Sequence, residues 1–257
     1  MKNLKILVVS HKKYEFPCDH CYYPIQVGKS DSQQDLGVLC DNIGYHISEK
    51  NNSFCELTAL YWAWKNKFFF NCEYIGLVHY RRYFKGNGLI FKNKKIASCY
   101  ELCNLLREYD VILPKQRNYY IESVYIHYKN AHFVQDLDKA KSIISNRHPE
   151  YLESFEKVVN GKKLYLYNMF IMKCDLLNDY CEWLFDILFA LEEQLDISQY
   201  NLYQKRVFGF ISERLFNVWL DKNKPNKKEL KVINLDGENL LKKALGLLKR
   251  KFLKEKE

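Results

Sequence analysis

Short apolar runs alternate along this chain with longer stretches in which apolar residues recur every three or four positions. Three of the runs, residues 4–9, 74–80 and 165–172, are rich in β-branched and aromatic residues and predict buried strands. Shorter runs at residues 110–113 and 231–235 predict two further strands. Because strands that alternate with helices build layered folds, the pattern predicts an α/β sandwich with a mostly parallel central sheet.

Helical spacing dominates the segments between these runs. It predicts helices over residues 100–109, 175–195 and 207–220, and a mainly helical region over residues 119–160.

A capping box is expected at the start of one further helix. Ser53 and Glu56 have the spacing in which the serine hydroxyl caps the helix and the glutamate reaches back to the serine backbone. Apolar residues follow at helical spacing, so we expect this helix to continue to about Lys67.

The last twenty residues differ from the rest of the chain. Residues 238–257 place their apolar side chains on one helical face, and they carry seven basic residues against three glutamates. This pattern is typical of a helix that lies in an anionic membrane interface, but it also fits a terminal helix docked on the domain. We therefore divide the chain into a globular domain, residues 1–236, and a basic amphipathic C-terminal helix, residues 237–257.

Composition bounds the class of protein. The chain has 257 residues, of which 47% are hydrophobic, which suits one α/β domain with a full core. Its formal net charge of +9 favours a polyanionic partner, such as nucleic acid, an anionic membrane or a phosphorylated substrate. No nucleic-acid-binding motif is present, and the basic residues concentrate in the tail, so we expect no nucleic-acid partner.

Nine cysteines bear on the cellular compartment. No apolar run is long enough for a signal peptide or a membrane span, so we expect free thiols in a reducing cytoplasm. Cys18 and Cys21 form a single CxxC with no second pair near it in the sequence, which makes a zinc site improbable.

Several common catalytic motifs are absent from the sequence. The first strand is not followed by GxGxxG, and neither a P-loop lysine motif, nor HExxH, nor GxSxG occurs. No Asp-x-Asp ends an apolar strand, where nucleotide-sugar enzymes usually hold a metal and a diphosphate. The nearest spacing, Asp136 and Asp138, lies in a helical context.

Polar residues follow two of the predicted strands instead. Ser10, His11 and Lys12 come directly after the first strand, where open α/β sheets gather their ligands. The sequence HYRRYF at residues 79–84 ends the second strand with His79, Arg81 and Arg82. Arginine binds phosphate in a bidentate manner, so this pair could neutralise a leaving diphosphate; the alternative is a surface arginine pair in a turn.

Two further polar residues are candidates for chemistry. Glu213 lies in a predicted helix that follows Gly209, where a carboxylate can act as general base or can form a salt bridge with a neighbouring arginine. Asn168 interrupts a predicted apolar strand and needs a hydrogen-bond partner, which is either a ligand or a core group.

Four blocks of sequence carry a family resemblance. They are ISEKNNSFCELTALYWAWKN at 47–66, YIGLVHYRRYF at 74–84, YNMFIMK at 167–173 with DYCEWLFDILFALE at 179–192, and RVFGFISERL at 206–215. Together, in this order, they resemble the glycosyltransferase-like domain of capsular polysaccharide synthesis proteins. The resemblance implies a GT-A-like three-layer fold, a nucleotide-sugar donor, and a role in the assembly of capsule, O-antigen or another exopolysaccharide.

The resemblance also suggests a role for each candidate residue. Ser10, His11 and Lys12 would line the nucleotide, His79, Arg81 and Arg82 would hold the diphosphate, Tyr167 and Asn168 would touch the sugar, and Glu213 would be the base of an inverting reaction. The chain departs from the usual GT-A pattern because HYRRYF stands where an acidic pair is expected. A divalent cation such as Mn²⁺ or Mg²⁺ is compatible with the sequence, but no motif requires it.

The expected reaction moves a hexosyl group from a UDP-sugar to a lipid-linked oligosaccharide. Galactose or galactofuranose is favoured, because some relatives are assigned to these sugars. The protein would then work in the cytoplasm, at the inner face of the plasma membrane, with the C-terminal helix on the membrane surface. The alternative is a non-catalytic carbohydrate-binding or scaffold subunit of a polysaccharide assembly complex.

Overall fold

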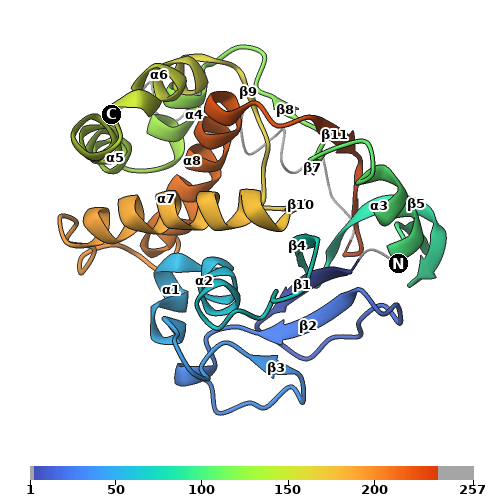
Figure 1. Cartoon of the computed structure of the whole chain (residues 1–257). Coiled ribbons are helices and arrows are strands. Elements are labelled where there is room, and N and C mark those ends of the chain that lie inside the picture. Colours follow the sequence, from blue (N-terminus) through green and yellow to red (C-terminus); the bar gives the residue numbers. More distant parts are fainter. Residues whose placement is uncertain (1–2, 237–257) are drawn as a thin grey trace.

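A mixed β-sheet forms the middle layer of the protein (Figure 1). The computed structural model describes residues 3–236. The main path of the sheet, from one edge to the other, is β11 (Lys227–Leu230), β7 (Val111–Pro114), β10 (Phe170–Lys173), β4 (Tyr74–His79), β1 (Leu4–Ser10), β2 (Tyr22–Gln26) and β3 (Leu39–Cys40). Neighbours on this path are parallel, except that β10 runs antiparallel to both β4 and β7.

A ribbon of strands extends the sheet beyond β4. The long strand β5 (Arg82–Phe91) pairs with β6 (Lys94–Ile96) and with β12 (Val232–Asn234), and it meets β4 through the pair His79 and Arg82. A separate two-stranded ladder joins β8 (Arg117–Asn118) to β9 (Lys163–Leu164).

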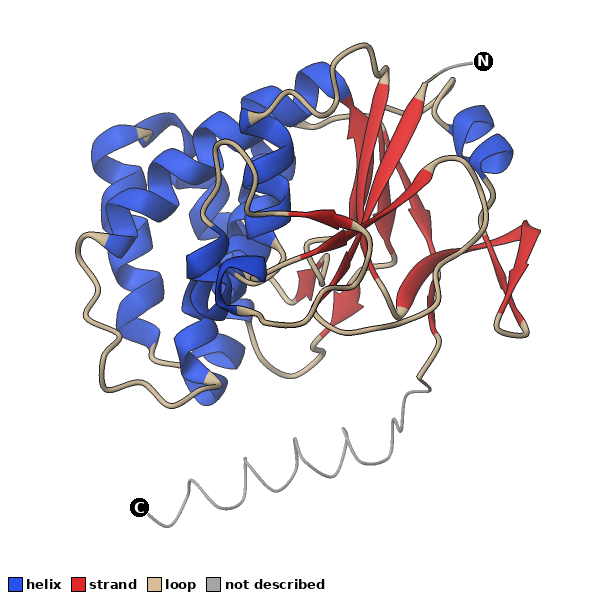
Figure 2. Cartoon of the chain, turned by 90° about the horizontal axis from the view of Figure 1, so that it is seen from below, coloured by secondary structure: helices blue, strands red, loops and turns tan. Residues whose placement is uncertain are grey.

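Helices cover the two faces of the sheet unequally. The described helices are α1 (Asn51–Phe54), α2 (Leu57–Lys65), α3 (Cys99–Leu105), α4 (Val124–Ala131), α5 (Val134–Arg147), α6 (Leu152–Asn160), α7 (Cys174–Glu192) and α8 (Val207–Asn223). Figure 2 shows most of them gathered on one side of the strands, with α3 and the β5–β6 ribbon on the other. The protein therefore has three layers.

The alternation along β1 explains the two cores. Leu7 and Val9 pack into the larger core under the helices, whereas Ile6 and Val8 pack into the smaller core under α3 and the ribbon. Successive side chains of a strand point to opposite faces, so a strand that is apolar at every position is buried on both faces.

The order of the strands creates a crevice at one edge of the sheet. From β1 the chain adds β2 and β3 on one side and then returns to add β4 on the other side. Val9 near the end of β1 is in register with His79 at the end of β4, so the loops that follow these two strands lie next to each other. Such reversals are where open α/β folds bind ligands.

The strand expected over residues 165–172 is shorter in the structure. It begins at Phe170, because Tyr167 and Asn168 adopt left-handed backbone conformations with φ of 77° and 49°. Asn168 therefore lies in a turn before β10 and does not interrupt a strand.

The capping box expected at Ser53 and Glu56 was wrong. A short helix α1 ends at Phe54, Cys55 has a φ of 54°, and α2 begins only at Leu57. The Ser53 hydroxyl donates to the Lys50 carbonyl oxygen, and Glu56 bonds a distant side chain. A capping box does form elsewhere, between Ser98 and Glu101 at the start of α3.

The amphipathic helix expected over residues 237–257 lies outside the described residues. In the part of the chain that the structure does describe, no helix combines the length and apolar character needed to cross a membrane.

All nine cysteines lie within residues 3–236, and they are free thiols.

Candidate active site

A cleft opens at the carboxyl ends of β1 and β4. It consists of two cavities that share four lining residues: Cys55, Glu56, Arg206 and Glu213. The first, which we call the strand-end cavity, has a volume of about 490 Å³, and its other lining side chains include His11, His79, Arg81, Arg82 and Tyr167. The second, the aromatic cavity, has a volume of about 340 Å³, and its other lining side chains include Tyr119, His127, His132, Tyr203, Phe210 and Arg214.

Close packing of α8 brings Glu213 into this cleft. Gly209 lies in the first turn of α8, and a Cβ atom there would stand 3.0 Å from the Cys55 Sγ atom. A larger residue would push α8 away from the segment between α1 and α2. Because residues four apart lie on one helical face, Glu213 also faces that segment, which carries Glu56.

The Glu213 carboxylate is held on both of its oxygen atoms. The Tyr167 backbone N–H donates to Oε1 at 2.7 Å, and the Arg214 guanidinium lies 3.1 Å from Oε2. The side chain is 19% exposed. Burial raises the pKa of Glu213, and the neighbouring Arg214 opposes this shift. A raised pKa strengthens the carboxylate as a proton acceptor.

Glu56 is the second carboxylate of the cleft. Its Oε1 accepts a hydrogen bond of 2.7 Å from the side-chain amide of Asn168. Asn168 is only 2% exposed and lines neither cavity; its amide also donates to the Ser212 hydroxyl at 2.9 Å. Asn168 thus lies beneath the wall of the cleft, where it ties Glu56 to α8.

Three arginines surround the strand-end cavity. The Arg82 guanidinium lies over the Tyr167 ring, 4.5 Å from its centroid. Arg81 is 40% exposed and forms an ion pair of 3.5 Å with Asp236. Arg206, whose role the sequence did not indicate, donates from Nε to the Cys55 sulfur at 3.3 Å. The cavity therefore presents guanidinium groups from two separate segments of the chain.

Two histidines complete this cavity. His79 Nε2 lies 2.7 Å from the Tyr167 carbonyl oxygen, and burial lowers the pKa of His79. The ring is therefore neutral near pH 7 and donates from Nε2. Burial also lowers the pKa of His11, and the nearby cations Lys12 and Arg81 add to the effect.

The other two residues expected beside the nucleotide line neither cavity. Ser10 is fully buried, and its hydroxyl donates to the Lys12 carbonyl oxygen at 2.7 Å. The Lys12 ammonium lies 5.2 Å from the centroid of the Tyr80 ring. Of the three predicted residues, His11 alone is among the residues that line the cleft.

Backbone strain gathers at this cleft. Cys55, Tyr167 and Asn168 all have positive φ, although none of them is glycine. Such conformations cost roughly 1–3 kcal/mol each and persist only where the surrounding structure holds them. Here they place the Tyr167 N–H on Glu213 and the Asn168 amide on Glu56, so the strained turn positions both carboxylates.

The cleft does not fit a divalent cation held by protein carboxylates. Its described acidic side chains are Glu56 and Glu213. Both oxygens of Glu213 are engaged, by the Tyr167 N–H and by Arg214. Glu56 accepts a hydrogen bond on Oε1, so Glu56 Oε2 is the one carboxylate oxygen of these described side chains left to a cation. The cluster of metal-ligating residues found within residues 3–236 lies elsewhere. The positive charges that the cleft itself offers to a diphosphate are its arginines.

Sequence reasoning missed Glu56, Arg206 and the aromatic cavity. The cavity rings come from separate segments: Tyr119 stacks on His127 with centroids 4.0 Å apart, and Phe210 lies 4.1 Å from His132 and 5.1 Å from Tyr203. No local pattern joins these residues. Glu56 lies in one of the four blocks that carry the family resemblance, so it could have been named as a candidate, but we interpreted it as part of a capping box.

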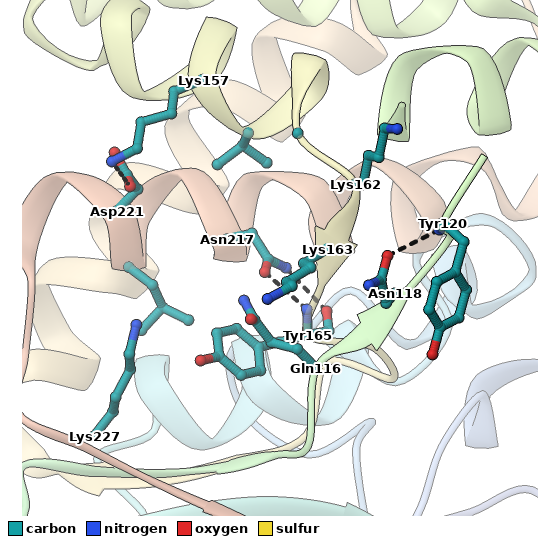
Figure 3. A pocket seen from close by; sticks show the side chains of 13 residues that line it. Gln116, Asn118, Tyr120, Lys157, Lys162, Lys163, Tyr165, Asn217, Asp221 and Lys227 are labelled. Carbon is teal, nitrogen blue, oxygen red and sulfur yellow. Dashed lines mark hydrogen bonds and ion pairs between the residues drawn. The ribbon is translucent and has the colours of Figure 1, made fainter. Parts of the chain in front are cut away.

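A separate hollow of about 500 Å³, which we call the lysine-rich hollow, lies beside β8 and β9. Figure 3 shows the side chains that line it, among them Lys157, Lys162, Lys163 and Lys227. Its aromatic and amide groups include Tyr165 and Asn217. It shares no lining residue with the cleft.

Comparisons with known proteins give two matches. The family model described as a domain of unknown function, DUF4422, matches residues 5–224. The solved apo structure of WbbM, described as a bifunctional glycosyltransferase, matches with a TM-score of 0.83 and 31% sequence identity. The match covers 92% of this chain and 46% of that chain, so this chain spans about half the length of the solved one. No curated protein matches significantly.

The match to the solved structure also bears on the expected architecture. It confirms a mixed α/β fold of the GT-A-like kind, with a mostly parallel central sheet along its main path.

Proposed function

The chain belongs to the DUF4422 family, and we propose that it is a glycosyltransferase that uses a nucleoside diphosphate sugar. One observation carries the proposal: an arginine-rich cavity at the strand ends joins an aromatic cavity, and Glu56 and Glu213 lie where the two meet. The likeness to a bifunctional glycosyltransferase supports the same reaction class.

The strand-end cavity is the proposed donor site. As the bond from the anomeric carbon to the diphosphate breaks, negative charge develops on the leaving oxygen. Arg81, Arg82 and Arg206 would stabilise this charge, and bidentate guanidinium–phosphate contacts suit it geometrically. The neutral His79 holds the Tyr167 turn, and His11 faces the nucleotide from the end of β1.

Glu213 is the proposed general base in a reaction that inverts the anomeric centre. The acceptor oxygen forms a bond to the anomeric carbon, the bond from that carbon to the diphosphate breaks, and the hydroxyl proton passes to the carboxylate. Glu56 competes for this role, because its Oε2 accepts no hydrogen bond from the residues described in the structure. Substitution of each by glutamine separates the two assignments.

The aromatic cavity is the proposed acceptor site. Sugar rings present apolar faces that stack on aromatic side chains, and Tyr203 and Phe210 offer such surfaces beside Glu213. A sugar in this cavity would bring a hydroxyl to the carboxylates while the donor occupies the neighbouring cavity. The geometry therefore supports two sugars that meet at Glu56 and Glu213.

The identity of the substrates rests on the family resemblance. We propose UDP as the nucleotide, a hexosyl group such as galactose or galactofuranose as the transferred sugar, and a lipid-linked oligosaccharide as the acceptor. The product would belong to a capsule, an O-antigen or another exopolysaccharide. A non-catalytic carbohydrate-binding or scaffold subunit is the alternative, and it predicts glycan binding without turnover.

A screen of the purified protein tests the proposal. UDP-sugars should raise the melting temperature by mass action, whereas ATP and NAD should not, and one UDP-sugar should release UDP in the presence of an acceptor. If UDP and UDP-sugars at millimolar concentration give no shift and another nucleotide does, the donor assignment is wrong. Glycan binding without nucleotide turnover would favour the scaffold subunit.

A membrane partner is proposed for residues 238–257. Seven basic residues near an anionic surface contribute about 1 kcal/mol each, and this attraction weakens with salt. Deletion of the segment should release the protein from anionic vesicles and leave transfer to a short soluble acceptor intact. If the full-length chain stays in the supernatant of a co-sedimentation assay at low salt, the membrane role is wrong.

A further inference from the structure

Three thiols, an imidazole and a carboxylate gather on the face of the sheet covered by α3. Cys99 and Cys103 lie one helical turn apart on α3, with their sulfur atoms 4.0 Å apart. Cys21, directly before β2, is buried in the same apolar cluster as Cys99. Donor atoms of Asp19, His20 and Cys99 lie within 4.8 Å of one another. None of these residues lines the cleft or the lysine-rich hollow.

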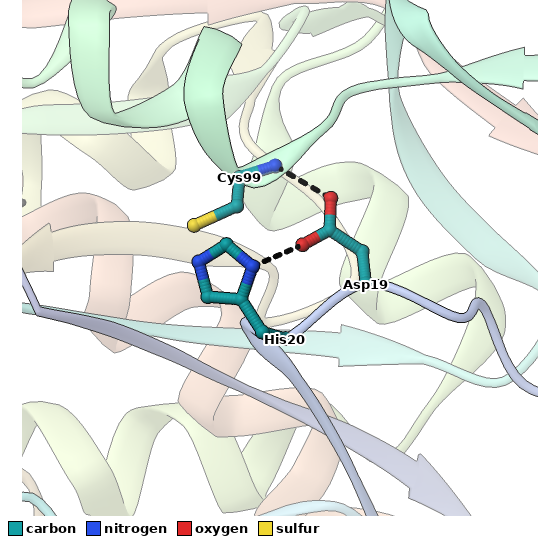
Figure 4. Close-up of side chains that lie close together, drawn as sticks. All are labelled: Asp19, His20 and Cys99. Atoms are coloured by element: carbon teal, nitrogen blue, oxygen red, sulfur yellow. Dashed lines mark hydrogen bonds and ion pairs between the residues drawn. The ribbon is translucent and has the colours of Figure 1, made fainter.

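The Asp19 carboxylate fixes the geometry of this cluster. One oxygen accepts the Cys99 backbone N–H at 2.9 Å, and the other lies 3.2 Å from His20 Nδ1. Figure 4 shows the His20 ring between the Asp19 carboxylate and the Cys99 sulfur. A carboxylate that holds Nδ1 leaves Nε2 available, and this is how proteins orient a histidine that binds a metal.

The types of donor select the class of metal. Thiolate and imidazole groups are the preferred ligands of zinc and related thiophilic cations, and three cysteines with one histidine form a common tetrahedral set. Ligand atoms around tetrahedral zinc lie about 3.5 Å apart. The Cys99 and Cys103 sulfur atoms are 4.0 Å apart, and the donor atoms of Asp19, His20 and Cys99 lie within 4.8 Å of one another, so metal binding requires side-chain rotations that draw these donors closer together.

Ordinary packing explains only part of this arrangement. Buried thiols are common in cores, and Asp19 caps the first turn of α3 without any metal. His20 is different, because its side chain is 72% exposed and yet lies against the carboxylate, beside a buried thiol. The cluster also joins residues about 80 positions apart, which is why the CxxC spacing in the sequence predicts no zinc site.

We propose that His20, Cys21, Cys99 and Cys103 bind one thiophilic divalent cation such as Zn²⁺, with Asp19 as the group that orients His20. Zinc displaces the thiol protons as it binds, so no oxidant or reductant is needed. The loop that starts at His11 in the cleft ends at this cluster. The ion would fasten the far end of that loop to α3, and this role does not depend on the proposed transferase activity.

Cobalt titration of the full chain, purified without metal, tests the site. We expect one equivalent of Co²⁺ to produce thiolate-to-cobalt charge-transfer absorption and tetrahedral visible bands, both displaced by Zn²⁺. Binding should also raise the melting temperature. A wild-type protein that shows neither absorption nor a shift with either metal overturns the proposal.

Variants identify the ligands. Cys99→Ser and Cys103→Ser should lose most of the charge-transfer absorption and bind the metal at least tenfold more weakly. Since Cys99 is buried and its variant can destabilise the core, His20→Gln supplies an exposed substitution that should keep the fold and weaken binding similarly. Cys18→Ser, an exposed cysteine of the same loop, is the matched control and should bind like the wild type. Cobalt spectra that are unchanged in His20→Gln and Cys103→Ser, or lost in Cys18→Ser, contradict this assignment.

Discussion

The strand-end cavity and the lysine-rich hollow have almost the same volume, about 490 and 500 Å³, and both present several cations. They differ in what holds those cations. In the hollow, Lys157 is 65% exposed and pairs with Asp221, and Lys227 lies 5.7 Å from the Tyr165 ring centroid. The Asn217 side chain bonds the Tyr165 backbone at both N–H and C=O, so it serves the fold.

In the cleft, carboxylates and arginines are brought together by strained backbone. Cys55, Tyr167 and Asn168 hold left-handed conformations in buried or half-buried positions. The hollow has one comparable residue, Tyr120, whose side chain is 75% exposed. Size and positive charge therefore do not distinguish the two. What distinguishes the cleft is a half-buried carboxylate, Glu213, whose pKa burial raises, beside a second carboxylate that strained backbone holds in place, and such features favour the cleft as the proposed active site.

Glu213→Gln gives the largest expected effect. The substitution keeps the shape of the side chain but removes the proton acceptor, so turnover should fall about 10²- to 10⁴-fold while donor binding persists. Steady-state kinetics and a UDP thermal shift measure the two quantities. Asp221→Asn in the hollow is the matched control and should turn over normally. If Glu56→Gln loses the activity and Glu213→Gln keeps it, the base is Glu56.

The pH profile sharpens this prediction. A base must be ionised, and burial raises the pKa of Glu213, so activity should be lost on acidification at a higher pH than for an ordinary glutamate. The residual activity of Glu213→Gln should lack this acidic limb. An identical limb in wild type and variant would assign it to another group.

Arg82→Ala should lower turnover by roughly 10²-fold, the scale of losing one contact to developing charge. Arg81→Ala should cost less, because Arg81 is 40% exposed and already pairs with Asp236. Lys163→Ala in the hollow is the matched control. If both arginine variants keep the wild-type kcat, the arginines of the cleft contribute no more to turnover than the lysines of the hollow do.

The sequence predicted the parts of this site that follow buried strands. The ends of β1 and β4 were found because apolar runs end there in polar residues. That the two strands are neighbours was learned from the structure, where Val9 is in register with His79. Glu213 and Tyr167 were also named, and they meet through a hydrogen bond of 2.7 Å.

Local patterns did not reveal the rest. The left-handed turn at Tyr167 and Asn168 is held by tertiary bonds to Glu213 and Glu56. The apolar sequence YLYNMFIM favours a continuous strand, and Asn168 is the one residue in it whose type tolerates positive φ. The helix break at Cys55 has the same kind of cause, since close packing on Gly209 occupies the position where a continuous helix was expected. Both errors arose where tertiary contacts override local propensity.

Tyr203→Ala should raise the KM for the acceptor and leave the KM for the donor unchanged. Loss of one stacking contact costs about 0.5–1.5 kcal/mol, which corresponds to roughly a 2- to 10-fold change. Tyr203 is 50% exposed, so the fold should survive. Tyr120→Ala, an exposed tyrosine of the hollow, should change neither KM. A rise in donor KM alone would move the donor into the aromatic cavity.

The smallest effect is expected from the hollow itself. Lys162 and Lys163 are exposed and line it without contact to any buried acid described in the structure, so the double variant Lys162→Ala/Lys163→Ala should keep its turnover and change stability by about 0.5 kcal/mol at most. The kinetics should be measured at low ionic strength, because any long-range attraction of a charged substrate by these lysines is strongest there. A loss of turnover comparable to that of Arg82→Ala, restored by neither salt nor excess acceptor, would mean that the hollow takes part in the reaction. The distinction would then fail, because a surface of solvated lysines without buried acids or strained backbone would have proved sufficient for function.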